Sequence, residues 1–200
     1  MAIPQLSDDV VRSAQLGDRD AFELLVLTYQ GPVFNHVFRL VGDRGFAEDI
    51  TQEVFSRVFQ KLPSFSFRSK FTTWLFQIAS NKVVDEMRAR ERRPHAGELP
   101  CDDLLSVADL AQEHAETIEA IWRAVGTLSI DLRAALLLRD VVGLSYDEIG
   151  ETLEITLATV KWRIYTAREE VQRALSREGI VVTTERERAA LGGRTAHSTA

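Results

Sequence analysis

The sequence predicts an all-α protein with two small helical domains joined by an acidic flexible linker. Several segments place apolar residues three and four positions apart, the spacing of a helix that buries one face. Stretches containing proline, glycine and aspartate separate these segments, and apart from the short run 180–182 nothing indicates a strand. With 200 residues, of which 45% are hydrophobic, the chain is long enough for two domains with their own cores.

The first domain is expected over residues 20–93, after a lead-in of residues 1–19. Its first apolar stripe, in residues 20–42, predicts either one long helix or a helix pair, because a Gly-Pro pair at 31–32 interrupts it. Asp20 is the candidate N-cap of this segment, since its side chain can accept a hydrogen bond from the first helical turn.

Two more helices complete the first domain. One is expected over about 46–62 and ends at Pro63, because the residue before a proline disfavours helical backbone angles. The other is expected over about 72–92 and ends at Pro94. Its apolar stripe consists of Trp74, Leu75, Ile78, Ala79, Val83 and Met87.

A change in composition marks the linker, residues 94–112. Residues 94–119 carry seven acids and neither lysine nor arginine, which leaves 24 cations against 23 acids in the rest of the chain. Five cations crowd into residues 82–93, just before this stretch. Because phosphate neutralisation dominates non-specific DNA binding, the net charge of −6 argues against a protein that simply coats DNA.

The second domain is expected over residues 113–176 and is followed by a flexible tail, 177–200. Ser145, with Glu148 three residues later, forms a capping-box pattern that predicts the start of a helix. After a short break, Thr156 can cap the next helix. The two helices together predict a helix-turn-helix.

The last of these helices combines an apolar inner face with an outer face of cationic, aromatic and hydroxyl side chains. Such a face suits entry into a DNA major groove, whereas the alternative is a solvated helical hairpin. Exposed aromatic side chains usually mark contact surfaces, which favours the first interpretation. Glu154, in the turn before the helix, stands where glycine is usual. The candidate DNA-binding residues are Thr156, Lys161, Trp162, Tyr165, Thr166 and Arg168.

An aromatic and basic loop precedes the third helix of the first domain. Rings and cations together can stack on unpaired bases and hold them, and the helix after the loop carries polar residues opposite its apolar stripe. The alternative is that the loop's phenylalanine rings only seal it against the core. The candidate DNA-binding residues here are Phe65, Phe67, Arg68, Lys70, Asn81, Asp85 and Arg88.

The helix over 46–62 carries an acidic face that includes Glu48, beside an exposed aromatic ring, either Phe55 or Phe59. The candidate docking residues are Asp49, Gln52, Glu53 and Phe55. An acidic face of this kind fits a docking surface for a basic protein partner. On the residues alone, a solvated helix face is the alternative.

Neither an enzyme nor a metal or cofactor site is expected. The single cysteine and four scattered histidines have no metal-ligand spacing, and no catalytic constellation or phosphate-binding loop stands out. A lone cysteine fits a reducing cytoplasm. No apolar run reaches the roughly 20 residues that span a bilayer, and the first residues lack the pattern of a secretory signal. We therefore expect a cytoplasmic protein without a small-molecule substrate and without membrane insertion.

Three segments, in their order and spacing, resemble a known family: DITQEVF at 49–55, TWLFQIASNKVVDEMR at 73–88, and GLSYDEIGETL with TVKWR and AR within 143–168. They resemble the extracytoplasmic-function, or group IV, sigma factors of the sigma-70 family, which are promoter-specificity subunits of bacterial RNA polymerase. The resemblance covers about residues 18–176. It implies a sigma2-like first domain and a sigma4-like second domain.

The resemblance also implies a role for each candidate surface. The acidic face at 49–55 would bind the polymerase clamp, and the loop 64–70 with the polar stripe at 81–88 would melt and capture the promoter element nearer the start site. The outer face at 161–166 would read the upstream element, and the acidic linker would pass near the RNA path. The implied partners are core RNA polymerase, promoter DNA and an anti-sigma factor that masks both domains.

A stand-alone helix-turn-helix regulator, whose first domain senses a ligand or dimerises, is the alternative function. It leaves the aromatic and basic loop unexplained, and the acidic net charge would weaken DNA binding in the absence of polymerase. Tight, specific duplex binding by the purified protein alone would favour it.

Overall fold

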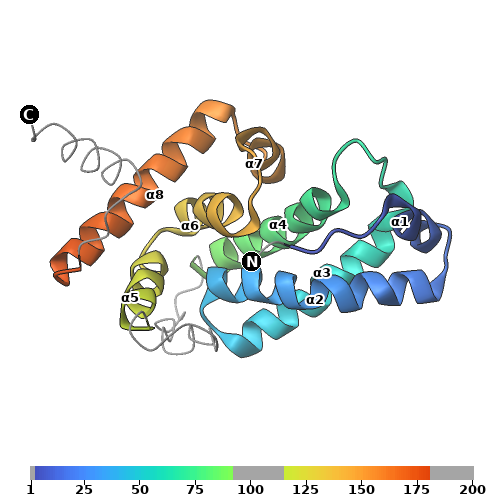
Figure 1. Cartoon of the computed structure of the whole chain (residues 1–200), viewed down its shortest axis with the longest axis horizontal. Coiled ribbons are helices and arrows are strands. Elements are labelled where there is room, and N and C mark those ends of the chain that lie inside the picture. The colour runs from blue at the N-terminus through green and yellow to red at the C-terminus, as the bar shows by residue number, and fades with distance from the viewer. Residues whose placement is uncertain (1–2, 92–114, 181–200) are drawn as a thin grey trace, which may run out of the picture.

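All regular structure in the described residues is helical, which confirms the predicted all-α class (Figure 1). The computed structural model describes residues 3–91 and 115–180, so the predicted linker and the tail beyond residue 180 lie outside the described residues. Among the described helices, none combines the length and apolar character that a bilayer crossing requires. The helices fall into an amino-terminal group, α1 (Asp8–Gln15), α2 (Arg19–Val41), α3 (Arg44–Lys61) and α4 (Phe71–Glu91), and a carboxyl-terminal group, α5 (Ala115–Gly126), α6 (Ile130–Leu137), α7 (Tyr146–Leu153) and α8 (Leu157–Arg177).

Helix α2 runs without interruption through the Gly-Pro pair at 31–32, so the single long helix is the correct one of the two alternatives. The predicted N-cap was wrong by two residues. The carboxylate of Asp18, not of Asp20, accepts hydrogen bonds from the backbone N–H groups of Asp20 and Ala21. Asp20 instead lies inside the first turn, where its negative charge interacts favourably with the helix dipole and stabilises the helix. Helix α2 ends at Gly42, whose φ of 74° is the left-handed conformation that glycine adopts readily.

Helix α1 lies in residues that the sequence indicated only as a lead-in. Val11 and Ala14, three positions apart on one face of this helix, are buried against the core. At its end, the Gln15 side-chain amide donates hydrogen bonds to the carbonyls of Leu62 (3.0 Å) and Phe65 (2.8 Å). Helix α1 therefore anchors the loop between α3 and α4.

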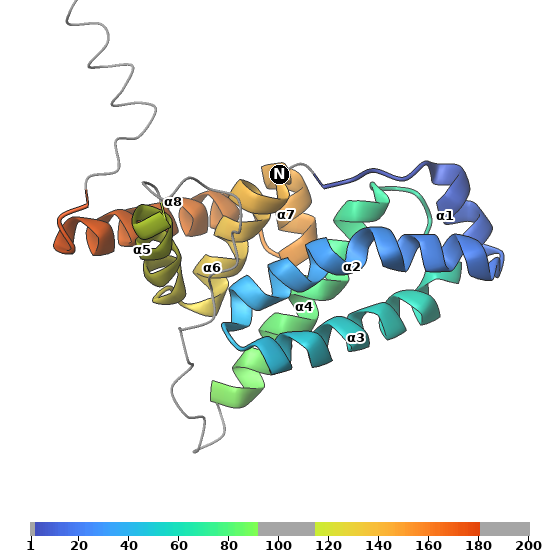
Figure 2. The same cartoon turned by 60° about the horizontal axis from the view of Figure 1, so that its bottom comes forward.

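Helices α2, α3 and α4 pack side by side and form most of the core of the amino-terminal group (Figure 2). Helix α3 begins after Asp43, whose carboxylate accepts a hydrogen bond from the Phe46 N–H at 2.7 Å. It ends in a short 3₁₀ turn, Leu62–Ser64, at the predicted proline. The apolar stripe predicted for α4 is confirmed, because Trp74 is partly buried and five residues are buried: Leu75, Ile78, Ala79, Val83 and Met87.

In the carboxyl-terminal group, α8 packs against α5, α6 and α7. The predicted capping box is present: the Ser145 hydroxyl accepts a hydrogen bond from the Glu148 N–H, and the Glu148 carboxylate accepts one from the Ser145 N–H. Thr156 caps α8 by accepting a hydrogen bond from the Thr159 N–H. The predicted helix-turn-helix is therefore confirmed as α7, a short turn and α8.

The two helix groups also pack directly against each other. Helix α4 contacts α6 and α7, and α2 contacts α6 (Figures 1 and 2). The Thr73 hydroxyl donates a hydrogen bond to the Glu148 carboxylate at 2.9 Å, and the Gln77 amide donates one to the Glu151 carbonyl at 3.1 Å. The sequence indicated two tethered domains but not the contact between them. In this contact, the side of α4 that carries Thr73 and Gln77 lies against α7 of the helix-turn-helix.

Candidate nucleic-acid interface

Helix α8 presents the outer face that the sequence predicts for DNA recognition. The apolar residues of its inner face at 160–167 are buried, and Lys161, Trp162 and Tyr165 are exposed on the other side. Trp162 and Tyr165 are 61% and 65% exposed, although both carry large rings. A packed inner face fixes the helix in place while the outer side chains stay available to a partner.

Hydrogen bonds within the carboxyl-terminal group order part of this face. The Tyr165 hydroxyl donates to the Glu169 carboxylate at 2.9 Å. Arg168 donates to the carboxylate of Asp140, at 2.6 and 3.3 Å, in the π-helical turn that follows α6 (Leu138–Val142). Thr166 is half-buried. A DNA phosphate would therefore have to share Arg168 with Asp140 or replace that carboxylate.

The turn between α7 and α8 contains a strained residue. Glu154 has φ 55° and ψ 43°, in the left-handed region. This conformation destabilises a residue with a side chain by roughly 1–2 kcal/mol because Cβ approaches the following carbonyl oxygen. The chain thus makes the turn that usually contains glycine, without a glycine.

We expect Glu154→Gly to raise the free energy of unfolding by about 0.5–1 kcal/mol, because glycine adopts left-handed angles without steric strain. The gain is smaller than the strain itself, since glycine also increases the entropy of the unfolded chain. Urea denaturation followed by circular dichroism measures the change. Glu151→Gly, inside α7, is the matched control and should lower the free energy of unfolding by about 1 kcal/mol. Equal losses in both variants would show that the turn is not strained.

The loop between α3 and α4 packs its two rings inward. Phe65 is buried, with its ring centroid 5.9 Å from that of Phe71 and 5.0 Å from that of Trp74. Phe67, at φ 56°, lies 4.7 Å from Phe65, and the guanidinium of Arg12 covers it at 4.0 Å. In this conformation the Phe65 ring is not available to a base. This agrees with the alternative that the ring seals the loop against the core. Stacking of a base on Phe67 requires Arg12 to move.

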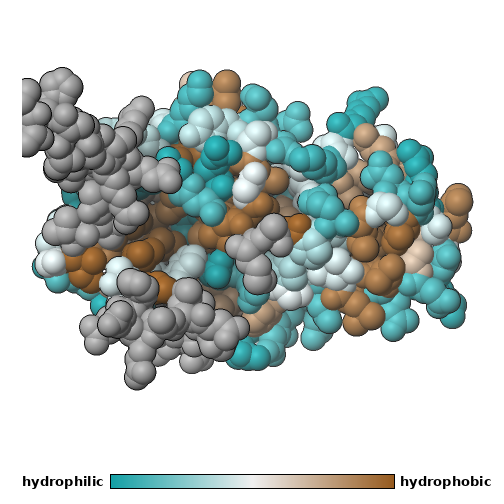
Figure 3. Space-filling model, in the orientation of Figure 1, coloured by the Kyte–Doolittle hydropathy of each residue, from teal (hydrophilic) through white to brown (hydrophobic). Residues whose placement is uncertain are grey.

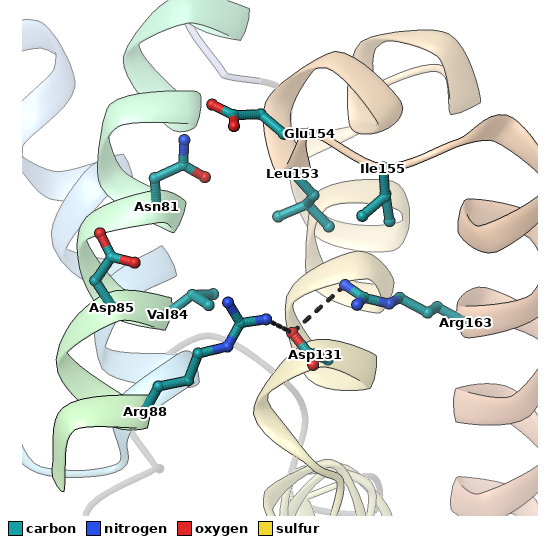
Figure 4. A pocket seen from close by; sticks show the side chains of 9 residues that line it. All are labelled: Asn81, Val84, Asp85, Arg88, Asp131, Leu153, Glu154, Ile155 and Arg163. Carbon is teal, nitrogen blue, oxygen red and sulfur yellow. Dashed lines mark hydrogen bonds and ion pairs between the residues drawn. The ribbon is translucent and has the colours of Figure 1, made fainter. Parts of the chain in front are cut away.

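The polar stripe of α4 lines a cleft between the two helix groups (Figure 4). Asn81, Asp85 and Arg88 form one wall of this cleft, whose volume is about 210 Å³. Arg88 donates a hydrogen bond to Asp131 of α6 at 2.8 Å. The structure therefore brings the three α4 candidates together but places them against the helix-turn-helix group. The other wall consists of Asp131, Leu153, Glu154, Ile155 and Arg163.

The acidic face predicted on α3 is exposed, and one of its carboxylates has a partner within the chain. Asp49 and Gln52 are exposed. Glu53 is also exposed but forms an ion pair with Lys82 of α4, whose side chain is almost fully buried and also binds Glu86 at 2.7 Å. Burial acts to lower the pKa of Lys82, but its hydrogen bonds to both carboxylates outweigh this and raise that pKa. Glu53 thus joins α3 to α4 as well as facing solvent.

Of the two rings that the sequence offered for this side, Phe55 and Phe59, the structure exposes Phe59. Phe55 is half-buried, whereas Phe59 is 64% exposed and meets the Phe22 ring edge-on at a centroid distance of 5.1 Å. Leu24 and Leu27 of α2 are exposed as well. On the face seen in Figure 3, apolar surface gathers at the end of the molecule where α1 and α2 meet. Phe59 lies two helical turns beyond Gln52, so the two side chains lie on the same face of α3.

Two family models match the chain: sigma-70 region 2 over residues 25–93 and sigma-70 region 4 over residues 118–171. The RNA polymerase sigma-H factor of Pseudomonas aeruginosa is 33% identical over 186 residues, which cover 88% of this chain and 96% of the relative. The ECF RNA polymerase sigma-E factor of Escherichia coli K12 is 35% identical over 179 residues, which cover 84% of this chain and 93% of the relative.

Two solved structures share the fold. CnrH, in complex with the cytosolic domain of CnrY, has a TM-score of 0.62 and 25% identity over 84% of this chain and 96% of its own. The sigma factor RpoE of Bartonella quintana, in complex with the anti-sigma factor NepR, has a TM-score of 0.61 and 28% identity over 78% of this chain and 96% of its own. The two matched regions lie in the two helix groups. The chain therefore belongs to the extracytoplasmic-function group of the sigma-70 family, whose members are non-enzymatic DNA-recognition subunits of RNA polymerase.

Proposed function

We propose that this chain directs RNA polymerase to its promoters by holding DNA at two places. Helix α8 reads the upstream element as a duplex, while the loop 64–70 and α4 melt and capture the element nearer the start site. The outer face of α8 supports this proposal most, because Lys161, Trp162 and Tyr165 are exposed above a packed inner face. Membership of the sigma-70 family favours a polymerase subunit over a stand-alone regulator.

For the upstream element, we expect Lys161→Ala with Tyr165→Ala to weaken promoter recognition about tenfold, because contacts to phosphates and base edges are lost together. Polymerase binding should stay intact. The measurement is run-off transcription from linear promoter DNA, together with co-purification on tagged core polymerase. Arg177→Ala, an exposed cation in the last turn of α8, is the control and should transcribe like the wild type. Equal loss of transcription and of polymerase binding would mean that this face of α8 serves the fold.

For the downstream element, we propose that Arg68 and Lys70 hold the phosphate backbone while Asn81, Asp85 and Arg88 contact unpaired bases. Both loop cations are exposed and can neutralise backbone phosphates. Asn and Arg side chains also suit base edges. Within the cleft Arg88 already pairs with Asp131, so a base that contacts Arg88 has to displace that carboxylate.

For polymerase docking, we propose that Asp49, Gln52, Glu53 and Phe55 contact the clamp, together with the exposed ring of Phe59. A charged face with an aromatic side chain can combine electrostatic attraction with apolar burial. The neighbouring leucines of α2 enlarge the apolar part of the same side of the molecule.

We expect Asp49→Ala with Gln52→Ala to weaken binding to core polymerase about tenfold, because both side chains are exposed and their loss removes polar contacts to the partner without opening the core. Titration of labelled core polymerase measures the affinity. Asp147→Ala with Gln172→Ala removes the same residue types from exposed positions on α7 and α8 and should bind normally. Unchanged affinity in the α3 variant would remove the docking proposal.

We further propose that the chain acts in the cytoplasm with core polymerase and promoter DNA, and that an anti-sigma protein controls it. In both solved structures the matching chain was captured with a second protein, CnrY for CnrH and the anti-sigma factor NepR for RpoE. No cofactor, small-molecule substrate or membrane insertion enters this mechanism. The domain limits that we propose are 20–93 and 113–176, joined by the acidic linker 94–112 that passes near the RNA path.

A further inference from the structure

The exposed large apolar side chains of the carboxyl-terminal group gather in one place. Leu157, Trp162 and Tyr165 are 42%, 61% and 65% exposed, and all three lie in the first half of α8. Between residues 117 and 180, as far as the structure describes them, no other large apolar side chain is this exposed. This half of α8 adjoins the turn that follows α7 (Figure 1). Apolar surface gathered in this way marks a contact with a partner.

Trp162 lies at the centre of this face. Successive residues of an α-helix are about 100° apart around its axis, so Trp162 points away from the buried side that Val160, Ile164 and Ala167 form. Tyr165 follows on the same side, about one turn later. The second helix of a helix-turn-helix contacts base edges with its first turns. With α8 in a major groove, the Trp162 side chain therefore faces the base edges.

Much of the hydrogen-bonding capacity near Trp162 is already used within the chain. The guanidinium groups of Arg163 and Arg168 each pair with an aspartate, at 3.5 and 2.6 Å. The Tyr165 hydroxyl donates to the carboxylate of Glu169 at 2.9 Å, so Tyr165 presents mainly its ring. Bidentate donation by arginine is how proteins most often recognise guanine. This face therefore offers a base pair more apolar surface than arginine donors.

We propose that Trp162 reads the methyl group of a thymine in the upstream element. The C5-methyl group is the apolar feature on the major-groove edge of the base pairs, and apolar side chains recognise thymine by contacting it. The indole N–H can only donate, and guanine, adenine and thymine all present acceptors in the major groove, so the N–H alone selects no single base. The inference rests on the proposed function, because it requires α8 to read duplex DNA, and it adds the chemical feature that α8 selects.

A protein surface is the other partner that an exposed tryptophan suits, and two features favour DNA. Trp162 lies in the turns of α8 that a helix-turn-helix directs at base edges. Beside it, Lys161 is exposed, and a lysine can neutralise a backbone phosphate while the neighbouring ring contacts a base. Trp162 and Lys161 together therefore suit a DNA groove, in which the apolar and the charged contact lie next to each other.

The test replaces thymine with uracil, which removes only the methyl group and keeps both the pairing with adenine and the O4 acceptor. Holoenzyme assembled from core polymerase and the full-length chain first selects duplexes from a library with a randomised upstream segment. Each thymine of the selected sequence is then replaced singly with uracil, and the affinity of the holoenzyme is measured by competition in fluorescence anisotropy. We expect uracil at one of these positions to weaken wild-type binding about fourfold, since burial of a methyl group stabilises a complex by roughly that factor.

Variants of two exposed residues assign the effect to the indole ring. Trp162→Ser should bind the thymine and uracil duplexes equally, whereas Trp162→Phe, which keeps an aromatic ring without the N–H, should retain most of the fourfold ratio. Lys161→Ala is the matched control. It should weaken binding to both duplexes and leave their ratio unchanged, because it removes a charge and leaves the ring in place. Both positions are exposed, so these substitutions leave the packed side of α8 intact.

The inference is overturned by a selected sequence in which no uracil weakens binding, by a methyl effect that persists in Trp162→Ser, or by one that disappears in Lys161→Ala. Binding of Trp162→Ser to every duplex with wild-type affinity would assign the ring to a protein partner instead. Failure of the holoenzyme to select any sequence would sink the proposed function, and this inference with it. A selected sequence without a methyl effect refutes the inference alone.

Discussion

Replacing Arg133 with methionine is expected to lower the free energy of unfolding by about 3 kcal/mol, because a buried guanidinium is replaced by a side chain that cannot donate hydrogen bonds. Arg133 is buried in α6 and donates to the Leu40 carbonyl of α2 at 2.6 Å and to the Leu128 carbonyl at 2.9 Å. It also donates to the Gly126 carbonyl. Each buried carbonyl left without a donor destabilises the fold by roughly 1–3 kcal/mol. Part of this loss is offset because the variant no longer buries a charged group.

Urea denaturation followed by circular dichroism measures this loss. Arg173→Met is the matched control, because Arg173 is exposed on α8 and pairs only loosely with Glu169, at 3.2 Å. The control should lose less than about 0.5 kcal/mol. A loss below about 1 kcal/mol for Arg133→Met would show that the carbonyls find other donors, and that this arginine does not hold α6 to the end of α2.

Lowering the pH is expected to destabilise the amino-terminal group through His36. Burial, with a smaller contribution from the charge of Arg39, lowers the pKa of His36 from 6.5 to about 3. Its Nε2 lies 2.9 Å from the Ser80 hydroxyl, and Nδ1 is buried with no hydrogen-bond partner among the described residues. A second proton on the ring would therefore sit on a buried nitrogen without an acceptor, so the folded protein keeps this imidazole neutral.

The direction of the effect follows from which state binds the proton first. Below pH 6.5 the unfolded chain protonates His36 while the folded chain does not, until pH falls to about 3. Stability is therefore unaffected by this group above pH 6.5 and falls by about 1.4 kcal/mol for each pH unit below it. At pH 4 the accumulated loss is about 3 kcal/mol.

Urea denaturation at a series of pH values between 7 and 4 gives this slope, and His36→Gln should make it shallower because glutamine does not titrate. NMR of the imidazole nitrogens in the wild type provides an independent check, with the neutral ring expected to persist well below pH 6.5. Identical slopes for both proteins, or an imidazole that protonates near pH 6.5 in the folded state, would show that His36 is not held neutral by burial.

Sequence patterns predicted those helices and caps whose interacting residues lie close together in the sequence. The capping box of Ser145 and Glu148, the cap by Thr156 and the apolar stripe of α4 all follow from spacing within one or two turns, and the structure confirms each. Glu154 stands where such turns usually contain glycine, which left a strained residue or a different turn as the alternatives, and the structure has the strained left-handed residue. Sequence spacing is reliable at this range because the interacting groups are covalently close.

Features that depend on tertiary contacts could not be predicted in this way. Phe65 is buried because the end of α1 holds the loop, through a hydrogen bond from Gln15 to a carbonyl 50 positions away in the sequence. The exposed ring is Phe59 rather than Phe55 because of how α2 and α3 pack. The contact of Asp131 with Arg88 joins residues 43 positions apart, and neither side chain indicates its partner from the sequence.

The central claim is that this chain gives RNA polymerase its choice of promoter. The most direct test is in vitro transcription of genomic DNA fragments by core polymerase, with and without the purified protein, followed by mapping of transcript 5′ ends. The account predicts discrete start sites that appear only with the protein, and that weaken when Lys161 and Tyr165 are replaced with alanine. Transcripts that are unchanged by the protein, or a protein that does not associate with core polymerase, would contradict it.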